Sequence, residues 1–258
     1  MSRRLHVEAW GAPASPHVVY LHGVTGHGRN AEALAQGWLG DYRVLAPDLL
    51  GHGSSPHEPP WSIGDQVAAL VETVGSTPAT WIGHSYGGRI ALELAALHPE
   101  LVERLVLLDP AILLDPMIAL HVAESARADR SYGSFDEGIT RRYEESVLQD
   151  VPRALIESDL RGFLVEDDDG RWRYRYSQAA VIASYGEMAS EPPAFESVRI
   201  PTLLVLGRRS FVTYDHLIDA HRAVLGAQLT VVTVDGGHTL LWDAPEETAA
   251  AIVAFLAQ

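Results

Sequence analysis

Cysteine and lysine are both absent from the 258-residue chain. The lack of cysteine excludes disulfides, thiolate metal sites, iron–sulfur clusters and thiol nucleophiles. The lack of lysine excludes Schiff-base catalysis, covalent attachment of pyridoxal phosphate and the lysine of a phosphate-binding loop. Several classes of covalent and metal-dependent chemistry are therefore excluded for this protein.

Positive charge is also scarce. All 19 basic residues are arginines, and 34 acidic residues bring the formal net charge to −15 at pH 7. Such a charge repels phosphate backbones and anionic lipids, and no run of basic residues offsets it. We therefore expect neither a nucleic-acid partner nor a membrane partner.

Long apolar runs are missing as well. No uncharged apolar run reaches the roughly 18 residues that a membrane-spanning helix needs. Residues 1–10 carry two arginines, but their apolar residues alternate with polar ones and form no signal-peptide core. Hydrophobic residues make up 47% of the chain and charged residues 21%, which is typical of soluble globular proteins. We expect a cytoplasmic protein whose single large domain carries an insertion.

Short apolar runs alternate with amphipathic stretches along most of the chain. This rhythm predicts an α/β fold, with a mostly parallel central sheet flanked by helices. The first run alternates at period two and is typical of an edge strand, whereas the later runs are nearly continuous, as in strands buried on both faces. Strands are predicted at residues 5–10, 17–21, 42–46, 79–82, 105–108, 202–206 and 229–234, and helices at 31–39, 63–74, 86–97, 216–225 and 245–256.

The rhythm breaks between residues 109 and 201, a gap much longer than a simple crossover. We interpret residues 112–198 as an inserted, mainly helical cap, and residues 1–111 and 199–258 as the core domain. Most aromatic side chains of the cap are expected to form its own core, and a few to line a pocket. These aromatics are Tyr132, Phe135, Tyr143, Phe163, Trp172, Tyr174, Tyr176 and Tyr185.

The strongest chemical signal is the sequence GHSYG at residues 83–87, between a predicted strand and a predicted helix. A strand that turns directly into a helix strains its corner residue, and glycines two positions away on either side prevent a steric collision. Ser85 occupies this corner and is the predicted nucleophile. The Tyr86 N–H and the helix dipole can stabilise negative charge on a bound carbonyl oxygen. The alternative is an ordinary helix-capping serine.

Together with three further segments, this motif resembles the α/β-hydrolase superfamily over nearly the whole chain. The resemblance implies that the Val24 N–H is the second oxyanion donor and that His238 is the catalytic base. It also implies that Asp48 and its neighbouring glycines shape the backbone. The matching segments are His22-Gly23-Val24, residues 47–55 (PDLLGHGSS), residues 83–88 (GHSYGG) and Gly236-Gly237-His238.

Twelve histidines compete for the role of base. His238 stands out because it follows the last predicted strand in a glycine-containing loop. His84 is expected to point away beside the nucleophile. His22 and His27 are expected to shape the oxyanion loop or the mouth of the pocket.

The triad acid is where the chain departs from the common family pattern. Many members carry it in a Gly-x-x-Asp turn after the penultimate strand, but here residues 207–210 read Gly-Arg-Arg-Ser. Haloalkane dehalogenases and some serine-dependent lactonases carry the acid after the strand that follows the nucleophile helix, which is the place of Asp109. Asp109 is therefore the predicted acid, with Asp215 and Asp235 as alternatives.

These groups suit acyl transfer through an acyl-enzyme, with no metal or organic cofactor. We predict a serine-dependent hydrolase of small carboxylic esters or lactones with an apolar or aromatic acyl part. Strongly charged substrates are not expected, because the basic residues show no clear anion clamp. The alternatives are a carbon–carbon bond hydrolase of the same fold and a small-molecule receptor with slow turnover.

Overall fold

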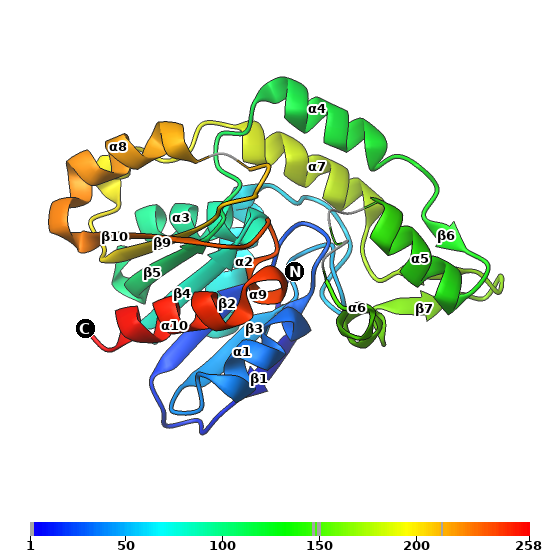
Figure 1. Cartoon of the computed structure of the whole chain (residues 1–258), viewed down its shortest axis with the longest axis horizontal. Helices are drawn as coiled ribbons and strands as arrows, with labels where there is room; N and C mark the ends of the chain where they lie inside the picture. The colour runs from blue at the N-terminus through cyan, green and yellow to red at the C-terminus, as the bar shows by residue number, and fades with distance from the viewer. Residues whose placement is uncertain (1–2, 146–147, 149–150, 213) are drawn as a thin grey trace.

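The computed structural model describes residues 3–145, 148, 151–212 and 214–258. Within them, seven strands form one sheet in the order β1-β3-β2-β4-β5-β9-β10 (Figure 1). Only the edge strand β1 pairs antiparallel, so the sheet is mostly parallel, as predicted. The strands are β1 (Val7–Trp10), β2 (His17–Leu21), β3 (Arg43–Pro47), β4 (Ala79–His84), β5 (Val102–Leu108), β9 (Thr202–Gly207) and β10 (Leu229–Val234).

Helices cover both faces of this sheet. Buried side chains of α2, α3 and α8 share one apolar cluster with the strands, and those of α1, α9 and α10 share another. The two hydrophobic clusters cover opposite faces of the sheet and bury its central strands on both sides, which explains their nearly continuous apolar runs. The helices are α1 (Glu32–Gly37), α2 (Ile63–Val74), α3 (Tyr86–Leu97), α8 (Asp215–Leu225), α9 (Leu240–Asp243) and α10 (Pro245–Leu256).

All seven predicted strands and all five predicted helices are present in the sheet domain. The bounds of several elements differ, most clearly in the helix predicted at 31–39, where a 3₁₀ turn at Gly28–Ala31 precedes a shorter α1. The sequence also gave no sign of the single-turn helix α9. Elements of one turn are too short for a periodic apolar pattern to reveal them.

The segment between β5 and β9 folds over the carboxyl ends of the strands (Figure 1). Its described residues form four α-helices, and also a small antiparallel sheet in the order β6-β8-β7 that the prediction of a mainly helical cap missed. Those strands have two or three residues each, too few to show alternation. The elements are α4 (Pro116–Ser125), β6 (Ser131–Tyr132), α5 (Phe135–Glu145), α6 (Arg153–Leu160), β7 (Leu164–Glu166), β8 (Trp172–Tyr174) and α7 (Gln178–Ala189).

Aromatic side chains hold this cap together. Tyr132, Phe163 and Tyr174 are buried in a cluster that is separate from the two clusters of the main sheet, and four other cap aromatics pack against it. Tyr185 is the exception, because it packs against the core cluster and lines the main cavity. Seven of the eight cap aromatics thus belong to the cap cluster, as expected, and one rather than several lines the main cavity.

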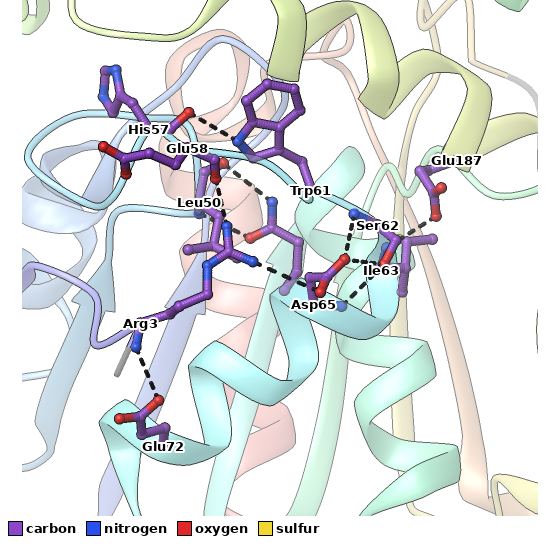
Figure 2. Close-up of polar contacts among 11 residues, drawn as sticks. Arg3, Leu50, His57, Glu58, Trp61, Ser62, Ile63, Asp65, Glu72 and Glu187 are labelled. Atoms are coloured by element: carbon purple, nitrogen blue, oxygen red, sulfur yellow. Dashed lines mark hydrogen bonds and ion pairs between the residues drawn. The ribbon is translucent and has the colours of Figure 1, made fainter. Parts of the chain in front are cut away.

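The cap is joined to the core at the first turn of α2 (Figure 2). Ser62 and Asp65 form a reciprocal capping box there, and Glu187 of the cap helix α7 accepts a hydrogen bond from the Ile63 N–H at 2.9 Å. Carboxylates at a helix N-terminus are stabilised by the unpaired N–H groups and the helix dipole. Glu187 therefore fixes α7 onto α2 through a charge-assisted contact.

Main-chain bonds fasten the cap at a second place. The Gly53 N–H donates to the Arg175 carbonyl at 2.6 Å, and the Ser177 N–H donates to the Gly51 carbonyl at 2.7 Å. These bonds connect the turn after β3 with the chain that enters α7.

No helix in the described residues is long and apolar enough to cross a membrane.

Candidate active site

Ser85 lies on the sharp turn between β4 and α3. Its backbone has φ 53° and ψ −117°, a conformation that is strained for any residue except glycine. A Cβ atom on Gly83 would lie 2.4 Å from the Gly87 carbonyl oxygen, and one on Gly87 would lie 2.3 Å from the Leu21 carbonyl oxygen. Both glycines are therefore needed for this turn, which places Ser85 at the carboxyl end of β4.

The structure brings Ser85, His238 and Asp109 into one chain of hydrogen bonds. His238 Nε2 lies 2.9 Å from Ser85 Oγ, and His238 Nδ1 lies 2.6 Å from Asp109 Oδ2. Asp109 is 1% exposed, so its carboxylate faces the imidazole and not water. With Nδ1–H donating to Asp109, Nε2 is free to accept the serine proton, as a general base must. The catalytic roles of the three residues stay predictions.

Asp109 is held by the turn after β9, where the common family pattern has its own acid. The Gly207 N–H donates to Asp109 Oδ1 at 3.1 Å, and the Ser210 hydroxyl donates to Asp109 Oδ2. The Asp109 N–H donates to the Val205 carbonyl at 2.8 Å. From the sequence, Ser210 was seen only as the residue that replaces the acid of the common family pattern. Its place in a Gly-x-x-Ser turn was the signal that it lies near the triad.

The two alternative acids have different surroundings. Asp235 accepts a short hydrogen bond from Arg209 and is largely exposed. In the described part of the chain its carboxylate pairs with Arg209 and not with the imidazole of His238, so Asp235 is a surface ion-pair partner of Arg209. The backbone of Asp215 starts α8, but its side chain lies outside the described residues.

Replacement of Ser210 by alanine is expected to lower kcat about tenfold and to leave KM nearly unchanged, because one hydrogen bond to the buried Asp109 carboxylate is lost. Ser210→Thr keeps the hydroxyl and is the matched control. Steady-state kinetics with a p-nitrophenyl ester would measure both variants. A threonine variant as impaired as the alanine variant would show that packing, and not the hydroxyl, is what matters at this position.

The predicted oxyanion donors lie beside Ser85: Val24 is in the loop after β2, and Tyr86 is the first residue of α3. The N–H groups of Val24 and Tyr86 make no hydrogen bond within the described part of the chain, so both can bind a ligand oxygen. His52 Nε2 lies 2.6 Å from the Val24 carbonyl oxygen and so holds the peptide between Val24 and Thr25. Val24 also lines the main cavity, beside Ser85. The two N–H groups stay candidates for the oxyanion hole.

His22 shapes the oxyanion loop, as expected. The Leu49 N–H donates to His22 Nε2 at 3.0 Å, so the ring carries its proton on Nδ1 and donates it to the Gly23 carbonyl at 2.7 Å. Burial, with a further contribution from His52, holds the pKa of His22 well below its usual range, which keeps the ring neutral. Asp48 has the structural role that was expected, because its carboxylate accepts the Gly28 N–H at 2.7 Å.

Two other histidines contact different partners from those expected. His84 does not point away from the site: its Nε2–H donates to the His238 carbonyl at 2.8 Å and ties β4 to the histidine loop. Burial lowers the pKa of His84 to about 4, so the ring is neutral at pH 7. His27 lies 3.0 Å from Asp159 of the cap helix α6, so it joins the two parts of the chain.

A cavity of about 800 Å³ lies over Ser85 and His238. Core loops and the cap helices α4, α5 and α7 form its walls. Most of the wall area is apolar, but two arginines of the cap, Arg130 and Arg142, also line it. Neither arginine was predicted at the site from the sequence. The apolar lining includes Leu113, Ile118, Val122, Tyr185, Met188 and Phe211.

Comparisons with known proteins agree with this architecture. A family model described as alpha/beta hydrolase fold matches residues 16–245. The chain is 36% identical to the lipase LipV of Mycobacterium tuberculosis, over 96% of both chains, and 28% identical to the sn-1-specific diacylglycerol lipase ABHD11 of Mus musculus, over 96% of this chain and 83% of that protein. The solved structure of E-2-(acetamidomethylene)succinate hydrolase superposes with a TM-score of 0.83 at 25% identity, covering 98% of this chain and 95% of its own. The chain therefore belongs to the alpha/beta-hydrolase family.

Proposed function

We propose that this protein is a carboxylic ester hydrolase that uses Ser85 as nucleophile, His238 as general base and Asp109 as the triad acid. The observation that carries the proposal is the hydrogen-bond chain from Ser85 Oγ through His238 to the buried Asp109, at the floor of the cavity. The chain's curated relatives support the reaction type, because they include proteins named as lipases and esterases.

The reaction follows from this geometry. Ser85 Oγ attacks the ester carbonyl carbon while His238 Nε2 takes the hydroxyl proton, and the Val24 and Tyr86 N–H groups bind the oxyanion. Asp109 holds the imidazole in the required tautomer and stabilises its protonated form. His238 then gives the proton to the leaving alcohol, and an acyl-enzyme remains on Ser85. A water molecule, activated by His238 in the same way, releases the acid.

The cavity favours compact substrates with an apolar part. Its volume of about 800 Å³ lies within the usual range for small-molecule sites, and aliphatic and aromatic side chains form most of its wall. A cyclic ester reacts by the same steps as an open one, since both present a carbonyl carbon to the serine. The substrate class is therefore small carboxylic esters and lactones.

Two measurements on the wild-type protein test the proposal. Hydrolysis of p-nitrophenyl esters, from acetyl to long acyl chains, is expected to be fastest for the shorter chains because the cavity has a finite volume. A fluorophosphonate is expected to add its mass once, on the tryptic peptide of residues 44–89, which contains Ser85. A label on another peptide would contradict Ser85 as the nucleophile. The absence of both labelling and ester turnover would contradict the serine mechanism and favour carbon–carbon bond hydrolysis or ligand sensing.

A further inference from the structure

Arg142 places a positive charge in the cavity above the nucleophile. It belongs to the cap helix α5, and its Nη1 lies 3.4 Å from Thr25 Oγ1. Thr25 directly follows Val24, whose N–H is one of the proposed oxyanion donors. Since consecutive Cα atoms are only about 3.8 Å apart, the guanidinium contacts the loop that would hold the reacting carbonyl.

The guanidinium of Arg142 has few protein partners. Among the described residues, the Thr25 hydroxyl is its one hydrogen-bond acceptor, and no carboxylate lies within 4.0 Å of it. Its Nε is buried and has no acceptor in that part of the chain. A guanidinium has five N–H donors, and leaving buried donors unpaired is unfavourable. An acceptor supplied by a ligand would satisfy them.

The adjacent arginine shows the contrast. Arg141 is half-exposed, and its Nη1 pairs with Glu144 at 2.9 Å on the outer side of α5. Arg141 therefore has an ordinary surface ion pair, whereas Arg142, one residue further along the same helix, turns toward the cavity. Two neighbouring residues of equal charge thus have different surroundings, which makes Arg141 a matched control.

Other groups on the cavity wall agree with a local positive charge. Arg130 lines the same cavity. Burial raises the pKa of the Tyr185 phenol on that wall, while the charges of Arg130 and Arg142 oppose the increase. The wall also contains the carboxylate of Asp115, but that group caps α4 by accepting the Met117 N–H at 2.8 Å.

We infer that the preferred substrate carries a carboxylate in addition to the scissile ester, and that Arg142 binds this carboxylate. A planar guanidinium pairs with a carboxylate through two parallel N–H···O bonds, which fixes orientation as well as affinity. The inference rests on the proposed function and narrows its substrate class. It departs from the sequence-based expectation that strongly charged substrates are not bound, which depended on finding no clear anion clamp among the basic residues.

Two esters with the same six-carbon acyl chain test the inference. Monoethyl adipate ends in a carboxylate where ethyl hexanoate ends in a methyl group, and acid release from both can be followed in a pH-stat. Arg142→Gln is expected to lower kcat/KM for monoethyl adipate by about 10- to 100-fold, mainly through KM, and to change that for ethyl hexanoate less than about twofold. Arg141→Gln, which removes the same charge, is expected to leave both values unchanged. An equal loss with both esters in Arg142→Gln would overturn the inference, because it would indicate a structural role.

A binding measurement separates this inference from the proposed function. Titration calorimetry with adipate on the Ser85→Ala protein needs no turnover. Combining Arg142→Gln with Ser85→Ala is expected to raise the Kd for adipate about tenfold or more. If wild type cleaves neither ester but adipate binding depends on Arg142, the proposed function fails and the anion site stands. If esters are cleaved through Ser85 but adipate binds both proteins equally, the inference fails and the proposed function stands.

Discussion

Ser85→Ala is expected to lower kcat/KM for p-nitrophenyl butyrate by about 10⁵-fold or more, since removing the nucleophile of a serine triad leaves only the oxyanion hole and substrate binding. The fold should be unaffected, because alanine at the strained φ of 53° is no worse than serine. Stopped assays with high enzyme concentration would measure the remaining rate, and circular dichroism would check the fold.

The same variant should also lose fluorophosphonate labelling. Residual turnover within about tenfold of wild type, in a preparation shown to be free of contaminating esterase, would contradict Ser85 as the nucleophile. The partly exposed imidazole of His98 is hydrogen-bonded to Glu100, away from the cavity, so His98→Gln serves as a control substitution. That variant is expected to keep full activity and full labelling.

Asp109→Asn is expected to lower kcat by about 10⁴-fold, because an asparagine there selects the wrong imidazole tautomer. The Gly207 N–H donates to Oδ1, so the asparagine oxygen is held at that position and the amide nitrogen faces His238 Nδ1. An N–H facing Nδ1 forces the ring proton onto Nε2, where it blocks acceptance of the Ser85 proton. Steady-state kinetics with p-nitrophenyl butyrate would measure the loss.

Asp235→Asn is the matched control for this change. It removes one carboxylate from the neighbourhood of the same loop but breaks only a surface contact with Arg209, so kcat is expected to change less than about twofold. Near-normal turnover in Asp109→Asn would reassign the acid. Asp215 would then be the remaining candidate, and Asp215→Asn would be the next variant to measure.

The sheet domain could be predicted from sequence because its signals are local. Short, dense apolar runs at residues 17–21 and 105–108 mark the strands β2 and β5, and residues 83–87 combine a glycine pattern with a strand–turn–helix context. Those signals require no knowledge of distant parts of the chain. The position of Ser85 at the end of β4 followed from them directly.

The choice of acid could not be made from sequence in the same way. Asp109 follows β5, and Ser210 lies in the turn after β9. The two strands are neighbours in the sheet, so their carboxyl ends bring both residues to one place. The sequence showed two loops that could each hold an acid, but not that both loops meet at His238.

The cap residues were the least predictable. Arg142 reaches Thr25 although 117 residues separate them along the chain. Its direction depends on how α5 packs on the cap's aromatic cluster and on how the cap is fastened to the core, and no local pattern encodes either. The composition did not indicate a positive charge in the cavity, since a net charge of −15 suggests a protein that repels anions.

The distances along the chain within the site also have a consequence for folding. His238 is 153 residues from Ser85 and 129 residues from Asp109, and both partners have a positive φ that an isolated segment would not adopt. A refolding intermediate with β4 and α3 formed, but with β10 unpaired, has the serine turn and no base. Recovery of ester hydrolysis after dilution from denaturant should therefore follow the last pairing of the sheet, and not the first appearance of helix signal. The time course of regained activity would then report when the native sheet is complete.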